Sequence, residues 1–364
     1  MKIAQVAPLA ESVPPQLYGG TERIVSYLTE ELVRQGHEVT LFASGDSVTS
    51  AELVAVTERA LRLDPDVIDP LALSMVLLER VAAEVDRFDV VHFHFDHTQY
   101  GYMRRLDAPS LATMHGRMDL PELVALFDEY AEIPLVSISD AQREPLPALN
   151  WLATIYHGLP MEQIPVYPEP GSYLAFLGRI SPEKRLDRAI EIAGGAGLPL
   201  KVAAKVDDVD REYFDSEIQH LITGGVEFVG EIADDAKDDF LGHAAALLFP
   251  IDWPEPFGLV MIEAAARGTP VLAFRNGSVP EVIDEGVTGV VVDTVEQAVA
   301  AIPGVLNLSR QAVRDATGRR FSAERMARDY VFVYQRLIEA RDGRAAAVAH
   351  SSAAGTSAPG AMAD

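Results

Sequence analysis

Apolar residues recur along the first part of the chain in short runs separated by amphipathic stretches. Five runs have the length and apolar content of buried strands: residues 2–7, 38–43, 90–95, 111–115 and 135–138. Residues 21–35 instead repeat apolar side chains at helical spacing, and Gly36 follows as a helix-ending residue. Strands that alternate with helices predict βα units around a parallel sheet.

The same alternation returns after a proline-rich segment. Residues 158–171 hold prolines at positions 160, 165, 168 and 170, which is typical of a linker between domains. Five further strands are expected, at residues 173–177, 200–204, 226–229, 246–249 and 271–273. The pattern predicts an α/β protein of two Rossmann-like domains, with a ligand cleft at the carboxyl ends of the strands.

The last part of the chain has a different pattern. A helix is expected over residues 321–341, because five apolar side chains recur there at helical spacing: Met326, Tyr330, Val333, Tyr334 and Leu337. From Ala345 onward Ala, Ser and Gly dominate, so residues 345–364 are expected to form a disordered tail.

Composition and charge narrow the class of protein. The 364 residues carry 30 Lys and Arg against 55 Asp and Glu, a net charge of −25. This argues against a nucleic-acid partner and does not favour docking on an anionic membrane, although a few cations gathered in a cleft could still bind an anion. There is no cysteine, no apolar run near ~20 residues and no signal-peptide pattern at the start, so we expect a cytoplasmic protein without a transmembrane segment.

The most informative segment is residues 252–264, DWPEPFGLVMIEA. Glu255 and Glu263 lie on either side of a Pro-Phe-Gly turn that opens a helix. Helix starts present unpaired N–H groups and the positive end of the helix dipole, which suits an anionic or hydroxyl-rich ligand. Upstream, Arg179 and Lys184 follow a predicted strand and supply fixed positive charge. A guanidinium binds two phosphate oxygens at once, and an ammonium acts as a point charge.

Together these segments resemble the donor site of retaining glycosyltransferases of the GT-B fold, glycosyltransferase family 4 (glycosyl transferases group 1), and the resemblance covers nearly the whole chain. It implies an acceptor domain at 1–165, a nucleotide-sugar donor domain at 170–320, and a C-terminal helix, 322–342, that crosses back to the first domain. It also implies transfer of a hexose from a nucleotide-diphosphate sugar, UDP-glucose being the best candidate, to a glycan, lipid-linked or small-molecule acceptor. It further implies that no cofactor or metal is obligatory.

The resemblance also implies roles for individual residues. Arg179 and Lys184 contact the diphosphate, Glu255 lies beside the donor sugar, and Glu263 binds the ribose. His115, at a strand end, lies near the sugar's C6 hydroxyl and the reacting carbon. The other donor-binding positions are the Gly-Gly loop after the first strand, the start of the helix and the place where relatives hold the base: Gly19, Gly20, Phe257, Gly258, Leu259, Val260 and Ile232.

Several patterns admit other interpretations. His92, His94 and Asp96 would share a strand face like metal ligands, but polar residues lining the cleft are the favoured interpretation. The D-x-D matches at 64–66 and 208–210 end no convincing buried strand, so we reject them as metal sites. The Glu255 and Glu263 pair could suggest a glycosidase, which would leave the neighbouring cations unexplained.

Other positions depart from the family pattern or carry little signal. Arg185 stands where many relatives have glycine, so its role stays open. Ser278 replaces a glycine in a Gly-x-Pro-Glu loop, which favours a structural turn there. Two alternative functions also remain: a GT-B sugar-nucleotide epimerase, and a non-catalytic sugar-nucleotide-binding protein.

Overall fold

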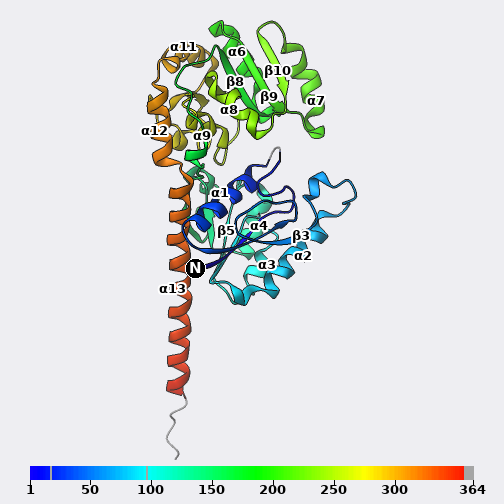
Figure 1. Cartoon of the computed structure of the whole chain (residues 1–364), viewed down its shortest axis with the longest axis vertical. Coiled ribbons are helices and arrows are strands. Elements are labelled where there is room, and N and C mark those ends of the chain that lie inside the picture. Colours follow the sequence, from blue (N-terminus) through cyan, green and yellow to red (C-terminus); the bar gives the residue numbers. More distant parts are fainter. Residues whose placement is uncertain (17–18, 96, 356–364) are drawn as a thin grey trace, which may run out of the picture.

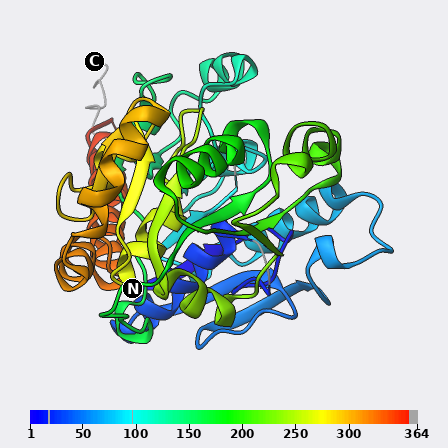
Figure 2. The same cartoon turned by 90° about the horizontal axis from the view of Figure 1, so that it is seen from above.

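The computed structural model describes residues 1–16, 19–95 and 97–355, with side chains for all of these except residues 63, 235 and 344–355. Two parallel β-sheets form two bodies stacked along the long axis of the molecule, and one long helix, α13, runs beside the first body (Figure 1). Seen from above, the two bodies overlap and helices surround both sheets (Figure 2). This is the α/β arrangement that the sequence predicts.

The N-terminal sheet has seven strands in the order β3-β2-β1-β4-β5-β6-β7, with every neighbouring pair parallel. All five predicted strands are present, and β3 and β7, which were not predicted, form the two edges. The strands are β1 Lys2–Val6, β2 Glu38–Ser44, β3 Glu52–Thr57, β4 Val90–Phe93, β5 Ser110–Thr113, β6 Leu135–Ser137 and β7 Trp151–Thr154.

The C-terminal sheet has six strands in the order β10-β9-β8-β11-β12-β13, again all parallel. The five predicted strands are present, and the unpredicted β13 forms one edge. The strands are β8 Tyr173–Arg179, β9 Leu200–Lys205, β10 Val226–Gly230, β11 Ala244–Phe249, β12 Val271–Phe274 and β13 Gly289–Val292.

Helices connect the strands in both bodies. The N-terminal body contains α1 Gly20–Arg34, α2 Pro70–Ala83, α3 Tyr100–Met103, α4 Pro121–Glu129 and α5 Asp140–Arg143. The C-terminal body contains α6 Leu186–Ala196, α7 Arg211–Tyr213, α8 Asp234–Gly242, α9 Leu259–Ala266, α10 Val279–Val282, α11 Val295–Leu306 and α12 Arg310–Arg320. The predicted first helix is confirmed, and Gly36 follows it with φ +85°, a conformation that a glycine adopts without strain.

The last helix, α13, spans Ala323–Gly355 and packs against the N-terminal body, as the GT-B resemblance implies. Its buried residues Met326, Tyr330 and Tyr334 share one apolar cluster with Ile3 and Leu28. The expected disordered tail differs in part, because the structure continues α13 through Gly355. The alanine-rich sequence explains this, since alanine is the strongest helix former; residues 356–364 lie outside the described residues.

The chain passes between the bodies twice, at adjacent places. Leu159 lies in the proline-rich segment after β7, Phe321 directly follows α12, and Ala323 is the first residue of α13. The Leu159 N–H donates to the Phe321 carbonyl at 2.8 Å, and the Ala323 N–H donates to the Leu159 carbonyl at 2.8 Å. The two crossing segments are therefore hydrogen-bonded to each other like neighbouring strands.

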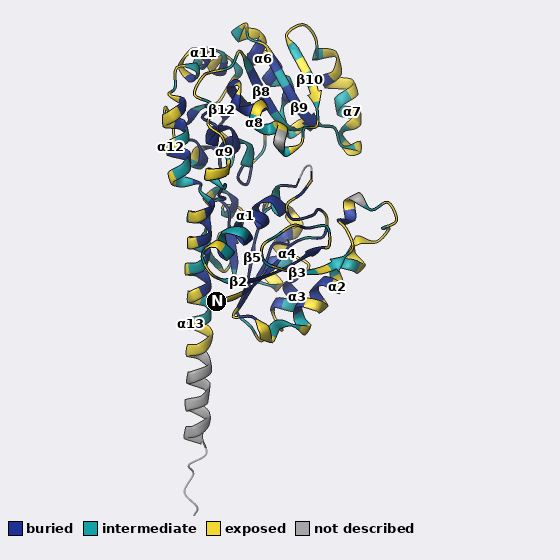
Figure 3. Cartoon of the chain, in the orientation of Figure 1, coloured by how far each residue is buried: buried dark blue, intermediate teal, exposed yellow. Residues whose placement is uncertain are grey.

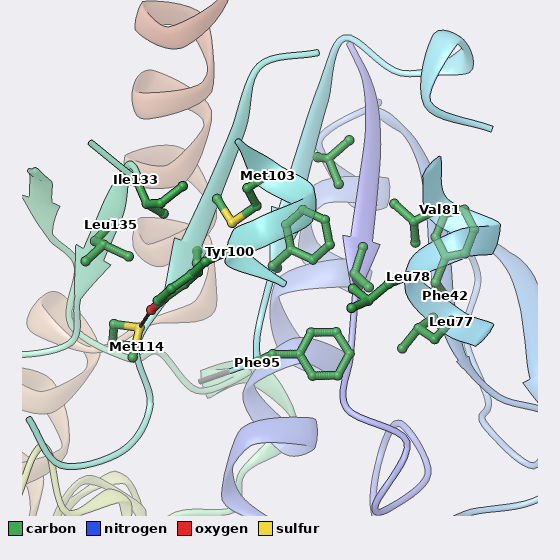
Figure 4. Packing of buried hydrophobic residues seen from close by; sticks show 14 of the residues in the cluster. Phe42, Leu77, Leu78, Val81, Phe95, Tyr100, Met103, Met114, Ile133 and Leu135 are labelled. Carbon is green, nitrogen blue, oxygen red and sulfur yellow. Dashed lines mark hydrogen bonds between the residues drawn. The ribbon is translucent and has the colours of Figure 1, made fainter. Parts of the chain in front are cut away.

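Buried residues, coloured dark blue, are concentrated on the strands, and exposed residues, coloured yellow, lie mainly on the outer helices and loops (Figure 3). In the N-terminal body, Phe42, Leu77 and Leu78 pack together between β2 and α2, and the Tyr100 hydroxyl donates to the Met114 sulfur at 3.0 Å (Figure 4). Among the described residues, no helix is both long enough and apolar enough to cross a membrane.

Candidate active site

A cavity of about 490 Å³ lies between the two bodies, where the carboxyl ends of β1, β5, β8, β9 and β11 converge. All of the residues predicted to bind or process a ligand line it: Gly19, Gly20, His115, Arg179, Lys184, Ile232, Glu255, Phe257, Gly258, Leu259, Val260 and Glu263. Positions up to 244 residues apart in sequence therefore face one space. This is the place where open α/β sheets bind ligands.

The start of α9 forms one wall of the cavity. Gly258 precedes the helix with φ +77°, and a Cβ there would lie 2.6 Å from Met261 Cε and 3.1 Å from Phe249 Cζ. Only glycine meets both demands without strain. The turn lets Phe257 point inward, with 2% of its surface exposed, while the first N–H groups of α9, which have no acceptor within the helix, lie at the cavity. An anion or a set of hydroxyl groups fits this wall.

Arg179 ends β8 and is surrounded by carboxylates. Its guanidinium lies 3.2 Å from Glu183, 3.7 Å from Asp207 and 3.8 Å from Asp210. About 30% of the Arg179 side chain is exposed, so its charge still reaches the cavity. The D-x-D match at 208–210 lies in a 3-10 turn and, as expected, ends no strand. Asp210 serves as an ion-pair partner of Arg179, which the sequence did not suggest.

Lys184 and Glu255 form the closest ion pair in the cavity wall. The Lys184 ammonium donates to Glu255 Oε2 at 2.5 Å, and Trp253 Nε1 donates to the same oxygen at 3.1 Å. The ammonium also lies 4.7 Å from the centre of a Trp253 ring, a cation–π distance. Gly277 supports this loop from behind, because a Cβ there would lie 2.4 Å from the Glu255 backbone. The pair fixes one cation and one hydrogen-bond acceptor side by side.

Glu263 is buried in α9 with 8% of its surface exposed. Burial by itself would raise the pKa of Glu263, but the positive charges of Lys237, Arg23 and Arg267 outweigh it and hold that pKa below its usual value. Lys237 Nζ lies 3.4 Å from Glu263 Oε1 and also pairs with Asp234 at 3.1 Å. Glu263 is therefore an ionised acceptor at neutral pH.

Polar contacts join the two bodies beside the cavity. Arg23, on α1, forms an ion pair with Asp234, at the start of α8. Glu281, in the Gly-x-Pro-Glu-like loop, accepts hydrogen bonds from the Asp140 and Ala141 N–H groups at 2.7 Å each and from the Tyr156 hydroxyl at 3.1 Å. Residues 275–278 form a turn after β12, and Glu281 lies in the short helix α10 that follows, from which it hydrogen-bonds to the N-terminal body.

The Gly-Gly loop reaches the cavity from the N-terminal body. A Cβ on Gly19 would lie 2.7 Å from Pro15 Cβ, so the loop is too tightly packed for a larger residue. A Cβ on Gly20 would lie 3.4 Å from Leu259 on α9, an ordinary contact distance. Tyr18, the residue before this pair, lies outside the described residues. The loop thus places the start of α1 next to the start of α9 at the cavity.

Four histidines form a row that ends at the cavity. The ring centres of His92 and His94 are 4.0 Å apart, those of His94 and His115 are 5.3 Å apart, and those of His115 and His157 are 5.3 Å apart with nearly parallel rings. His157 then meets Phe257 edge-on at 4.7 Å. Burial lowers the pKa of all four imidazoles, that of His115 to about 3, so each is neutral at neutral pH.

Hydrogen bonds to protein groups account for the positions of His92 and His94, the two histidines whose spacing resembled that of metal ligands. His92 contacts the Tyr334 hydroxyl and Thr113 Oγ1, both at 2.7 Å, and His94 contacts Gln5 at 2.7 Å and His115 at 3.0 Å. The ring nitrogens of both histidines are thus occupied by protein groups. Asp96 lies outside the described residues, and among the described ones no group of three or more His, Asp or Glu side chains is arranged to hold a metal ion.

The remaining positions have simple explanations. Arg185 has φ +54°, the conformation that favours the glycine of the family pattern, and pairs with Asp187 at 2.7 Å and Asp252 at 2.8 Å. Lys205 pairs with Asp207 at 2.6 Å at the edge of the cavity.

Sequence reasoning missed other residues that line the cavity: Glu11, Glu22, Arg23, Arg62, His157, Lys237 and Trp253. Trp253 lies inside the 252–264 segment and Glu22 just after the Gly-Gly loop, whereas the others come from loops and helices that carry no motif.

Two facing Rossmann-like sheets, a cleft between them and a C-terminal helix that returns to the first body define the GT-B fold. The chain belongs to the glycosyltransferases of family 4: the family described as "Glycosyltransferase Family 4" matches residues 18–153, and "Glycosyl transferases group 1" matches residues 161–319. The protein is therefore a glycosyltransferase.

Individual relatives match this chain over most of their length. A phosphatidyl-myo-inositol mannosyltransferase of Mycolicibacterium smegmatis is 29% identical over 345 residues, which cover 84% of this chain and 85% of that protein. The crystal structure of AviGT4, a glycosyltransferase involved in avilamycin A biosynthesis, matches with a TM-score of 0.72 and 26% identity over 93% of this chain and 98% of that one. Anabaena HepE in complex with UDP-glucose has the same fold, with a TM-score of 0.66 and 18% identity over 94% of this chain and 100% of that one.

Proposed function

We propose that this protein transfers a hexose from a nucleotide-diphosphate sugar to a hydroxyl acceptor with retention of configuration at the sugar carbon. The observation that carries the proposal is the single cavity in which Arg179, Lys184, Glu255, Glu263 and the start of α9 face the same space. Two cations and a helix N-terminus suit a diphosphate, and two carboxylates suit hydroxyl groups.

Breaking the donor bond leaves negative charge on the β-phosphate. In the proposed mechanism Arg179 and Lys184 stabilise this charge, as preorganised cations do in sites sheltered from water. Both cations are already paired with carboxylates, Arg179 with Glu183 and Lys184 with Glu255. The diphosphate has to compete with these carboxylates for the two cations. A donor without the phosphates makes neither contact, so it should bind poorly.

Glu255 is proposed to orient the donor sugar, and Glu263 to accept hydrogen bonds from the ribose hydroxyls. Glu255 accepts hydrogen bonds from Lys184 and Trp253, and Glu263 from Lys237, so both carboxylates are already held at the cavity before a ligand binds. The bond from the sugar carbon to the phosphate oxygen breaks, and its electron pair goes to the phosphate. The acceptor oxygen bonds to the same face of that carbon, and the leaving phosphate takes the acceptor's proton.

UDP-glucose is the proposed donor, and the structurally similar HepE supports this choice because it was crystallised with UDP-glucose. The acceptor is proposed to be a glycan, a lipid-linked sugar or a small molecule. Fixed cations can neutralise the leaving group, so the reaction is proposed to need no metal. The cytoplasmic location expected from the sequence stays a prediction.

A panel of UDP-, GDP- and ADP-sugars tests the proposal, first by thermal shift and then by slow hydrolysis with and without EDTA. We expect one nucleotide family to raise the melting temperature, and its diphosphate to be released at the same rate when EDTA is present. Loss of release in EDTA would overturn metal independence, and no stabilisation by any sugar nucleotide would overturn the site assignment. An epimerised sugar nucleotide without transfer would instead favour an epimerase, and binding without any turnover a non-catalytic binding protein.

A further inference from the structure

A chain of buried hydrogen bonds connects the C-terminal helix to His115 in the cavity. Tyr334 on α13 contacts Gln5 on β1 at 3.1 Å, Gln5 contacts His94 at 2.7 Å, and His94 contacts His115 at 3.0 Å. Gln5 and Tyr334 have no exposed surface, and His94 is 2% exposed. Because water does not reach these groups, each depends on its protein neighbours for hydrogen bonds.

The donor and acceptor in each of these hydrogen bonds follow from the orientation of the Gln5 side-chain amide. Its Nε2 donates to the Tyr334 hydroxyl, so its Oε1 faces His94 Nε2 and accepts a hydrogen bond from it. A neutral imidazole carries one N–H, so His94 Nδ1 is then an acceptor. The contact between His94 Nδ1 and His115 Nε2 therefore requires that His115 donates, and that its own proton lies on Nε2.

The far end of the chain is compatible with this orientation of the amide. The Tyr334 hydroxyl also lies 2.7 Å from His92 Nδ1. When it donates its proton to His92 it is left as an acceptor for Gln5, which matches the amide orientation. Tyr330 lies one turn earlier on α13 and contacts Thr113 at 2.8 Å, on the far side of His92 from Gln5. Tyr330 therefore belongs to the same buried cluster but not to the branch that leads to His115.

We propose that Tyr334, Gln5 and His94 are positioning residues that hold His115 as the Nε2–H tautomer, so that Nδ1 accepts a hydrogen bond from a substrate hydroxyl. His115 lines the cavity, and within the described part of the chain its Nδ1 has no hydrogen-bond partner. The second half of this statement rests on the proposed function, because it requires a sugar in the cavity. The first half concerns the ligand-free protein alone.

Neutral imidazoles are essential to this arrangement, because a protonated histidine has no acceptor nitrogen. Burial lowers the pKa of His94 and His115, as described above, which keeps both rings in the form that the chain of bonds requires. The packing of α13 on the N-terminal body is thereby connected to the proton position on a ring in the active-site cavity. A helix remote in sequence would set which hydrogen bond His115 offers to the substrate.

The test compares Tyr334→Phe with Tyr330→Phe. Each substitution removes one buried hydroxyl from α13, so the two should cost similar stability. Tyr334→Phe leaves the Gln5 amide without its acceptor, which frees the amide to turn, donate to His94 and reverse the tautomer of His115. Tyr330→Phe leaves that branch intact. We expect kcat to fall about tenfold in Tyr334→Phe, with donor KM within about twofold of wild type, and to change less than about twofold in Tyr330→Phe.

The tautomer itself is measured by long-range ¹H–¹⁵N NMR of ¹⁵N-histidine-labelled, ligand-free protein, with His115 assigned through His115→Gln. We expect a bare Nδ1 and a protonated Nε2 in wild type and Tyr330→Phe, and a mixed or reversed pattern in Tyr334→Phe. Protonated Nδ1 in wild type would overturn the inference even if neither variant folds. A correct tautomer pattern without any sugar transfer would overturn the proposed function instead, so the two failures are distinguishable.

Discussion

Lowering the pH from 7.5 to 5.5 should destabilise this protein through its buried histidine row. His92, His94, His115 and His157 all have pKa values held down by burial. In the unfolded chain each returns to the usual pKa of about 6.5 and takes up a proton as the pH falls below that value. The folded protein takes up none of these protons until much lower pH, so stability is full above about pH 6.5 and is lost as the pH falls below it.

The size of the effect follows from this difference in proton binding. One unit below a pKa of about 6.5, each histidine that stays neutral only in the folded state costs about 1.4 kcal/mol, so four cost up to about 5.6 kcal/mol. Two carboxyls act in the opposite direction, because burial raises the pKa of Glu11 and Glu22. Their folded forms bind protons at higher pH than their unfolded forms, and this adds stability mainly nearer pH 4.5. The histidines should dominate between pH 7.5 and 5.5.

Urea unfolding at pH 7.5, 6.5 and 5.5, followed by tryptophan fluorescence, measures the dependence. We expect the free energy of unfolding to fall by several kcal/mol, with about three protons bound on unfolding near pH 6. His157→Gln should reduce the pH dependence by about a quarter, whereas His220→Gln, at an exposed position, should leave it unchanged. A free energy of unfolding that stays constant from pH 7.5 to 5.5 would refute the assignment of neutral, buried rings.

Three further predictions concern single substitutions. Arg179→Ala should lower turnover by about a hundredfold or more, because it removes charge stabilisation and leaves the Glu183 carboxylate without its cation. The control Arg188→Ala removes an ion pair to Asp252 outside the cavity and should change turnover little, and wild-type turnover in a folded Arg179→Ala protein would refute the site assignment. Gly258→Ala should cost about 1–3 kcal/mol in urea unfolding and weaken donor binding, because φ is positive and Met261 is in the way, whereas Gly194→Ala, in open space on α6, should be neutral or stabilising; equal effects would contradict this reading of the α9 turn. Glu281→Gln should lower the free energy of unfolding by about 1–2 kcal/mol, since a charged acceptor of two N–H groups becomes neutral, and an unchanged urea midpoint would show that this contact does not hold the bodies together.

The sequence predicted every central strand and the edge strand β10, but it missed the edge strands β3, β7 and β13. Central strands of a parallel sheet are covered on both faces and read as continuous apolar runs, as in β11, where every residue is buried. Edge strands β3 and β7 are only partly covered, so their sequences mix polar and apolar residues. β13 is a different case: three of its four residues are valine, but the strand is only four residues long and begins with Gly289, where a Cβ would lie 2.1 Å from the Val271 carbonyl oxygen.

The residues of the candidate site also fall into those that the sequence predicted and those that it did not. Arg179, Lys184, Glu255 and Glu263 were predictable because short motifs at strand ends and helix starts hold them, and local geometry dictates those motifs. Tertiary packing alone creates the partners of these residues. Asp210 belongs to a D-x-D match that we rejected as a metal site, yet it lies beside Arg179 because the loop after β9 returns to the end of β8. No spacing rule connects Gln5 with Tyr334, which are separated by 329 positions.

The double crossing between the bodies has a consequence for how the chain is made. The first body contains β1, with Ile3, and α1, with Leu28, but its apolar cluster is completed only by Met326, Tyr330 and Tyr334. A ribosome would release all seven strands of the N-terminal sheet and then the whole C-terminal body before α13 emerges. The half that is synthesised first would therefore be finished last, and one of its faces would stay uncovered while the other half folds.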